Sequence, residues 1–184
     1  KMSSLEKALV HIREISKNDS DLGKAFEKLS KIFFENDATQ VQQYSKVWHY
    51  SDWAKEHKNY STTDIGIDLV AKLRGQEGYC AIQCKCYQSE YSITKSDLDS
   101  FISASSTSDF QRLILIDTST QPISKNAKSV FENLDKEYIR IQLSELEESR
   151  IDWSIYVTKG KISLRSKKTL RDHQIQALKD VKSG

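Results

Sequence analysis

The stretch that decides the fold runs from residue 66 to residue 87 and reads GIDLVAKLRGQEGYCAIQCKCY. Two runs of alternating residues, Gly66–Arg74 and Gly78–Tyr87, flank a turn sequence with Gly75 at its start and Gly78 at its end. Alternation with period two predicts strands, and a short loop bounded by glycines predicts that the strands form a β-hairpin. We therefore expect a β-hairpin at residues 66–87 to form the centre of the fold.

The alternation also sorts the side chains of each predicted strand onto two faces. Each strand has one apolar face, and its residues are Ile67, Leu69, Ala71 and Leu73 in the first strand and Cys80, Ile82, Cys84 and Cys86 in the second. A hairpin closed by two or four loop residues pairs Asp68 with Lys85 on the other face. In the same register Val70 faces Gln83. The hairpin therefore predicts one polar cluster of Asp68, Gln83 and Lys85.

The chemistry of this cluster suits hydrolysis of a phosphodiester. Carboxylate and amide oxygens are hard ligands for Mg²⁺, which completes its shell with water and phosphate oxygens. An ammonium group beside them orients a water molecule and offsets negative charge that develops in the transition state. The alternative is a plain cross-strand ion pair between Asp68 and Lys85, which contributes at most ~1 kcal/mol at an exposed position.

The rest of the chain changes between helical and strand-like patterns. Apolar residues at helical spacing predict one helix around Leu5–Ile12 and another around Leu22–Phe33. Part of Val47–Tyr50 is interpreted as an edge strand. After the hairpin we expect a helix, a strand, a helix and a strand, at residues 94–104, 112–116, 125–134 and 138–143. This order predicts an α/β fold with a mixed β-sheet, made of the hairpin and a strand-helix-strand unit and flanked by helices.

Composition limits the class of protein. The length of 184 residues suits one compact domain, and 28 Lys and Arg against 26 Asp and Glu give a net charge of only +2. This balance does not by itself predict a nucleic-acid binder. No apolar run approaches the ~18 residues that a membrane span needs, so we expect no membrane partner. The three cysteines are an odd number crowded into one strand, which indicates a reducing cytoplasm rather than a disulfide framework.

Several of these segments carry a family resemblance. Residues 66–70 (GIDLV) followed by 81–87 (AIQCKCY) resemble the active-site hairpin of the PD-(D/E)XK nucleases, most closely the Mrr-like branch, in which Gln replaces an acidic residue. Residues 23–27 (GKAFE) resemble the N-terminal helix of that branch, and residues 47–53 (VWHYSDW) also fit it. The resemblance implies a restriction-endonuclease-like fold and a Mg²⁺-dependent endonuclease of bacterial origin.

The resemblance also implies a role for individual residues. Asp68 is expected to hold the metal, Gln83 to bind the metal or a water, and Lys85 to be the catalytic lysine. The backbone carbonyl of Cys84 is expected to be a further metal ligand, and Glu27 to reach the active site from its helix. Two departures from the family pattern are that Ile67 replaces the usual proline and that Gln83 removes one negative charge from the site.

The last residues resemble the lead-in to a helicase. Residues 170–178 (LRDHQIQAL) are similar to the start of a superfamily-2 helicase domain. A nuclease ahead of a helicase is the layout of the single-chain Type ISP restriction–modification enzymes. We therefore expect a nuclease domain at residues 1–158, then a basic linker and the start of a helicase-like domain at 159–184. The expected partners are double-stranded DNA, the helicase, methyltransferase and target-recognition domains of the same natural chain, and a second nuclease copy for double-strand cleavage.

Simpler interpretations remain beside several of these residues. Glu27 could pair with Lys31 one helical turn away, and Asp64 could be a second acid or a turn residue. The cysteines could bind zinc, although small buried hydrophobic residues explain their shared face better. The sequence contains no G-x-x-x-x-G-K-[ST] loop, so no ATP site is expected in this chain.

The sequence thus predicts a DNA endonuclease module that nicks one strand per domain and forms the N-terminal part of a helicase-coupled restriction enzyme. Two alternatives stay open. One is a non-catalytic relic of the nuclease fold that only binds or docks DNA, and the other is a structure-specific repair nuclease.

Overall fold

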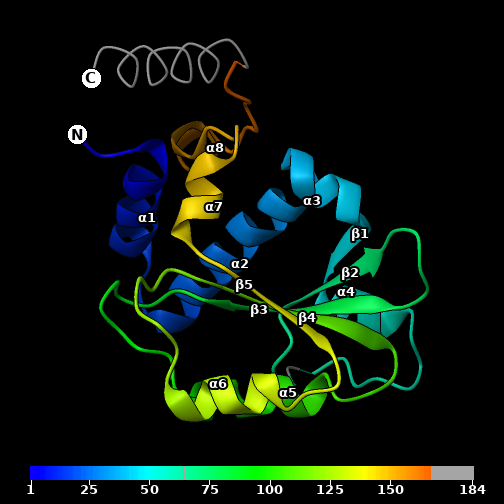
Figure 1. Cartoon of the computed structure of the whole chain (residues 1–184). Coiled ribbons are helices and arrows are strands. Elements are labelled where there is room, and N and C mark those ends of the chain that lie inside the picture. Colours follow the sequence, from blue (N-terminus) through cyan, green and yellow to red (C-terminus); the bar gives the residue numbers. More distant parts are fainter. Residues whose placement is uncertain (64, 167–184) are drawn as a thin grey trace, which may run out of the picture.

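A mixed five-stranded sheet forms the centre of the computed structural model, which describes residues 1–63 and 65–166 (Figure 1). Strands β1 to β3 are antiparallel, and β3 to β5 are parallel. The strands follow one another in sequence order across the sheet: β1 (Tyr44–His49), β2 (Leu69–Leu73), β3 (Tyr79–Lys85), β4 (Phe110–Asp117) and β5 (Glu137–Ile141). This architecture confirms the predicted α/β class, the hairpin and the strand-helix-strand unit.

Helices cover both faces of the sheet (Figure 1). One face carries the helices of the two chain ends: α1 (Ser4–Ile15), α2 (Asp19–Asn36), α3 (Ala38–Gln43), α7 (Leu143–Glu148) and α8 (Trp153–Lys159). The other face carries α4 (Tyr50–Lys55), α5 (Lys95–Ala104) and α6 (Lys125–Glu132). Because α5 and α6 connect parallel strands, both lie on the same side of the sheet, as right-handed crossovers require.

The longest helix shows how one core forms from sequence. In α2 the side chains of Phe26, Leu29 and Phe33 recur at helical spacing and are almost completely buried. They pack in one cluster with Leu69 of β2 and Ile82 of β3. Burying a side chain of this size stabilises the fold by roughly 1.5–3 kcal/mol. Helix α2 is therefore packed firmly against the hairpin of β2 and β3.

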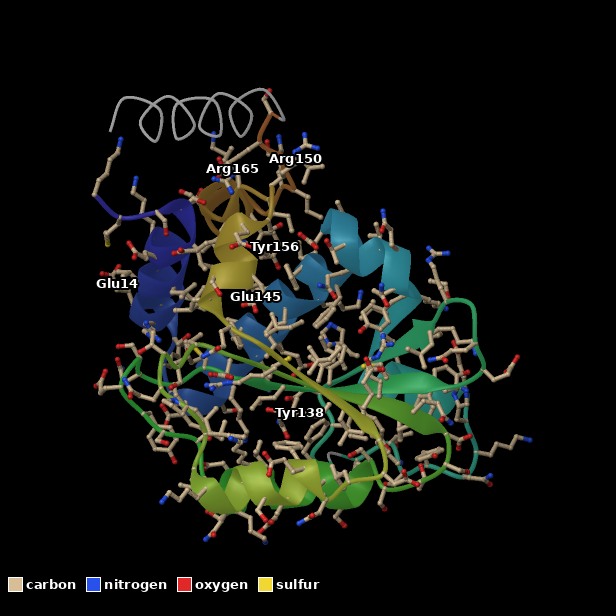
Figure 2. The ribbon with its side chains drawn as sticks, in the orientation of Figure 1. Glu14, Tyr138, Glu145, Arg150, Tyr156 and Arg165 are labelled. Atoms are coloured by element: carbon tan, nitrogen blue, oxygen red, sulfur yellow. The ribbon has the colours of Figure 1, made fainter. Side chains whose placement is uncertain are left out.

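A second core lies between the sheet and α4, α5 and α6. Phe101 of α5 and Phe131 of α6 are buried there. Tyr138 of β5 points toward α6 (Figure 2), and its ring stacks on Phe131 with 3.7 Å between the ring centroids. These contacts hold α5 and α6 against the face opposite α2.

The hairpin register differs from the predicted one by two residues. Leu69 lies opposite Ile82, and Val70 lies opposite Ala81 rather than Gln83. The N–H of Leu73 donates to the carbonyl of Gly78 over 3.3 Å, so residues 74–77 form the loop. A shift of two residues keeps the paired side chains of β2 and β3 on their predicted faces, because the strand period is two. Asp68 lies just before the paired residues and donates its N–H to the Ile82 carbonyl over 3.0 Å, so the predicted direct pairing of Asp68 with Lys85 is wrong.

The face predicted for Ile67 is also wrong. Ile67 packs with Val70 in the core beside α5, not with Leu69 beside α2. The strand begins only at Leu69, and Gly66 just before it has a φ of +102°. A Cβ at Gly66 would come within 2.7 Å of the Ser100 backbone, so only glycine fits this close approach to α5. The bend at Gly66 ends the alternation on which the prediction relied.

The described chain ends in a short segment that folds back onto the domain. Asp152 N–H donates to the Ser163 carbonyl over 2.7 Å, and the Arg150 side chain donates to the Arg165 carbonyl over 2.8 Å. Figure 2 shows Arg150 and Arg165 beside each other at this end of the molecule. The domain boundary at residue 158 remains a prediction. Asp64 and residues 167–184, including the helicase-like stretch, lie outside the described residues. No helix in the described ranges combines the length and apolar content of a membrane span.

Candidate active site

A cleft of about 1000 Å³ opens at the end of the hairpin where β3 ends and β2 begins. Helix α2 contributes one wall, and the N-terminal half of α5 contributes the other. The residues predicted from the sequence line it together: Glu27, Asp68, Gln83, Cys84 and Lys85. The fold therefore brings the whole predicted set to one concave surface.

The carboxylate of Asp68 is held by the strand opposite it. Its Oδ2 atom accepts a hydrogen bond from Gln83 Nε2 and another from the backbone N–H of Cys84, both at 2.7 Å. Two donors on one oxygen fix the direction of a carboxylate. Since the Gln83 amide donates to Asp68, its carbonyl oxygen is the group that remains to accept or to ligate.

Lys85 lies two residues beyond Gln83 on β3 and shares the cleft with Asp68. Lys85 lies three residues beyond Ile82, which pairs with Leu69, so it is not the direct cross-strand partner of Asp68. No ion pair joins Lys85 to Asp68 within residues 1–63 and 65–166. The alternative of a plain cross-strand ion pair is therefore not what the structure shows.

Glu27 reaches the cleft from α2 and is held by a histidine. Its Oε1 atom lies 2.7 Å from Nδ1 of His49, the last residue of β1. The alternative partner, Lys31, instead pairs with Glu35 at 3.0 Å. The sequence analysis did not single out His49 as part of the site, because the two residues come from distant segments that only the packing of α2 against β1 brings together.

The three cysteines of β3 and its C-terminal end differ in how deeply they are buried beside this site. Cys80 and Cys84 are buried in the core shared with α2, and burial raises the pKa of both thiols. Burial also raises the pKa of the Cys86 thiol, which is only partly buried. Thiols with a raised pKa stay protonated and pack as small apolar groups. This environment matches the interpretation of Cys80 and Cys84 as core residues.

The wall formed by α5 contains a carboxylate network that the sequence analysis missed. Asp97 accepts hydrogen bonds from the Tyr91 hydroxyl at 2.8 Å and the Tyr87 hydroxyl at 3.3 Å. Burial alone would raise the pKa of Asp97, but hydrogen bonds from Thr94 and the two tyrosines bring it below its ordinary value. The spacing of Thr94 and Asp97 is a capping-box pattern and was the available signal.

The donor set fits a hard divalent cation. The cleft offers carboxylates from Asp68 and Glu27 and the carboxamide of Gln83. In the described part of the chain no three His, Cys, Asp or Glu side chains form a metal site of their own. A divalent cation that uses one or two carboxylates and completes its shell with water and phosphate oxygens would suit such a sparse site.

Comparison with solved structures finds a similar restriction–modification enzyme. The chain aligns over its full length with 11% of the chain of the ATP-dependent Type ISP restriction–modification enzyme LlaBIII bound to DNA, at 27% identity and a TM-score of 0.67. Two further matches, the modification-dependent endonuclease AspBHI and the MspJI endonuclease with an oligonucleotide, are 13% and 12% identical, with TM-scores of 0.46 and 0.37. They cover 86% and 87% of this chain and 36% of each of those chains.

The match to LlaBIII supports the restriction-endonuclease-like fold, and this chain spans only about a tenth of that protein. A search of curated protein sequences finds no match. Comparison with protein families identifies residues 35–163 as Mrr_cat_2, described as a restriction endonuclease. This region contains Asp68, Gln83 and Lys85 but not Glu27. Because the matched region is most of the chain, the protein belongs to the Mrr_cat_2 family of restriction endonucleases.

Proposed function

We propose that this chain is a Mg²⁺-dependent DNA endonuclease that nicks one strand of double-stranded DNA per domain. The observation that carries the proposal is the cleft in which Asp68, Gln83 and Lys85 lie together, with Asp68 held by two hydrogen bonds of 2.7 Å. A fixed carboxylate, an amide oxygen and an ammonium group are the groups that metal-assisted hydrolysis of a phosphodiester requires.

In this proposal Asp68, Gln83 and the backbone carbonyl of Cys84 hold the cation, and Glu27 adds negative charge nearby. When bound, the metal supplies Lewis-acid stabilisation for charge that develops on the phosphate. Lys85 orients the attacking water and donates to a phosphate oxygen as its charge grows. Gln83 keeps the Asp68 carboxylate turned toward the cleft through the hydrogen bond from its amide.

The wider role proposed for the chain is that of an N-terminal cleavage module. In that role helicase, methyltransferase and target-recognition domains of the same natural chain deliver the DNA in a bacterial cytoplasm, and two nuclease copies together cut both strands. The similarity to one part of the Type ISP enzyme LlaBIII supports this arrangement. The small net charge of +2 also supports it, because non-specific binding to DNA alone would need many basic contacts.

A nicking assay on supercoiled plasmid tests the proposal. The purified chain is expected to nick the plasmid with Mg²⁺ and to stop when EDTA removes the metal. Lys85→Met should lower the rate by at least about 100-fold, since it removes an ammonium group that acts in the transition state. Lys128→Met, an exposed lysine of α6 outside the cleft, is the control that should keep its activity.

Two outcomes would replace the proposal. DNA binding by the wild-type chain without any nicking, in the presence of either Mg²⁺ or Mn²⁺, would indicate a non-catalytic relic of the fold. Cleavage of branched DNA with no nicking of plasmid would indicate a structure-specific repair nuclease. Wild-type activity in Lys85→Met would overturn the assignment of the site.

A further inference from the structure

We infer that His49 is a positioning residue of this nuclease, which acts by holding Glu27 in the cleft. The inference rests on the proposed function and concerns a residue to which the family resemblance assigns no role. Its basis is the 2.7 Å contact between His49 Nδ1 and Glu27 Oε1. One carboxylate oxygen of Glu27 is thereby fixed on β1, while the residue itself lines the cleft beside Asp68.

The end of β1 links Glu27 to Asp68 through a short chain of contacts. His49 pairs with Leu69 across the sheet, and the next residue, Tyr50, donates its backbone N–H to the Asp68 carbonyl over 2.9 Å. The backbone that follows His49 is thus bound to the residue expected to hold the metal. His49 then reaches across to Glu27 on α2. This arrangement sets the position of one acid relative to the other.

Stability alone does not explain the pair. The side chains of His49 and Glu27 are 31% and 24% exposed, and a polar contact with that access to water adds little to stability. Helix α2 is already anchored by the buried Phe26 next to Glu27. A long acidic side chain such as that of Glu27 has several rotamers, and the hydrogen bond from His49 selects one of them. The choice of rotamer is important in the cleft, because it sets the direction of the carboxylate that lines it.

The expected cost of losing the contact follows from the behaviour of groups that orient metal-site carboxylates. Removing such a partner typically lowers metal affinity or activity by about 10- to 100-fold. His49→Ala should therefore lower the nicking rate by about that factor. His49→Asn should recover most of it, because the Asn amide places an N–H close to the position of Nδ1.

A double-mutant cycle distinguishes a positioning role from an independent one. The proteins are wild type, His49→Ala, Glu27→Ala and the double variant, each assayed for plasmid nicking. If His49 acts through Glu27, the double variant is no slower than Glu27→Ala. Glu35→Ala is the matched control, because Glu35 is also an acid of α2 in a 3.0 Å ion pair but does not line the cleft. It should nick at the wild-type rate.

Calorimetric titration with Mg²⁺ alone supplies a readout that does not depend on cleavage. His49→Ala should weaken Mg²⁺ binding, and the double variant should bind no more weakly than Glu27→Ala. Unchanged nicking and unchanged Mg²⁺ binding in His49→Ala would overturn the inference, as would losses in the double variant that equal the product of the single losses. Failure of the proposed function has a different signature: wild type itself does not nick, while the Mg²⁺ titrations still report on His49.

Discussion

Two aspartates lie next to the ends of β2 and β4, the strands on either side of β3, and their surroundings differ. Asp117 ends β4, is fully buried, and is bound by Arg140 through two hydrogen bonds of 2.9 and 3.0 Å. Asp68 precedes β2, lines the cleft, and accepts from the Gln83 amide and the Cys84 N–H at 2.7 Å. Asp117 lies level with Lys85 in the parallel pairing of β3 and β4, so both acids belong to one end of the hairpin.

The comparison separates a structural acid from one suited to catalysis. A buried carboxylate that is paired with a guanidinium holds segments of the fold together, and its negative charge is compensated inside the protein. Asp68 instead accepts from the Gln83 amide and the Cys84 N–H and lines the cleft, where a cation can approach its carboxylate. We therefore expect substitution of Asp68 to change activity and substitution of Asp117 to change stability.

The largest expected effect is on catalysis by Asp68→Asn. Removing the charge while keeping the shape should lower plasmid nicking by about 1000-fold or more, because the metal site loses its main carboxylate. The free energy of unfolding in urea should change by about 1 kcal/mol or less, since the amide oxygen still accepts from the same donors. Asp68→Ala should likewise abolish cleavage. Nicking at the wild-type rate in either variant would contradict the comparison.

Asp117→Asn should show the opposite pattern. It leaves the side chain of Arg140, which is only 15% exposed, without its carboxylate, and should lower the free energy of unfolding by about 3 kcal/mol. Nicking measured well below the melting temperature should persist, because Asp117 does not line the cleft. In urea titrations, adding Arg140→Met should recover part of the loss by removing the uncompensated charge. A stable, inactive Asp117→Asn protein would break the comparison.

A smaller effect is expected from Gln83→Glu. The variant keeps an oxygen ligand and adds charge, but it loses the amide donor that holds Asp68 at 2.7 Å. Cleavage should remain detectable, about tenfold below wild type, which corresponds to roughly 1.4 kcal/mol in the barrier. The Mg²⁺ concentration that gives half the maximal rate should fall because a second carboxylate attracts the cation. Gln83→Leu, which has no oxygen, should be slower, and equal rates in the two variants would contradict a ligand role for residue 83.

The register of the hairpin marks the limit of what its sequence predicts. Alternation placed Asp68, Gln83 and Lys85 on a common face, since a side chain changes face only if the register shifts by an odd number. It did not distinguish loops that differ by two residues in register. The observed loop at residues 74–77 pairs Leu69 with Ile82 and leaves Lys85 beyond the paired residues, not opposite Asp68. Within the paired strands the face was predictable from local sequence, whereas pairing depended on the geometry of the turn and the face of Ile67 on the bend at Gly66.

Other features depended on contacts between distant segments. The long helix α2 and the buried strand β4 have strong periodic patterns and were predicted, while the six-residue helices α3 and α4 are too short for a period to show. The contact of His49 with Glu27 joins residues that are 22 positions apart. Neither residue carries a local signal for it, because the contact exists only once α2 packs on the sheet.

The smallest expected effect comes from Gly23, which lines the cleft from the first half of α2. A Cβ added at Gly23 meets no atom within 4 Å, so Gly23→Ala should raise the free energy of unfolding by about 0.5–1 kcal/mol through helix propensity alone. Gly75 is the matched control. It is equally uncrowded but has a φ of +75°, so Gly75→Ala should lower stability by about 1 kcal/mol.

Urea denaturation of the two glycine variants measures this difference directly. If Gly23→Ala raises the free energy of unfolding and Gly75→Ala lowers it, backbone conformation rather than available space explains the difference between the two glycines. The gain in Gly23→Ala would also show that α2, which forms one wall of the cleft, could be more stable with another residue at position 23. Natural proteins commonly leave stability unoptimised where a functional surface is formed. Asp117 differs, because its described hydrogen bonds come from Arg140 and the Ser119 N–H inside the protein and stabilise the fold. If Gly23→Ala instead lowers the free energy of unfolding, the cleft wall and the Asp117 region would not differ in this respect.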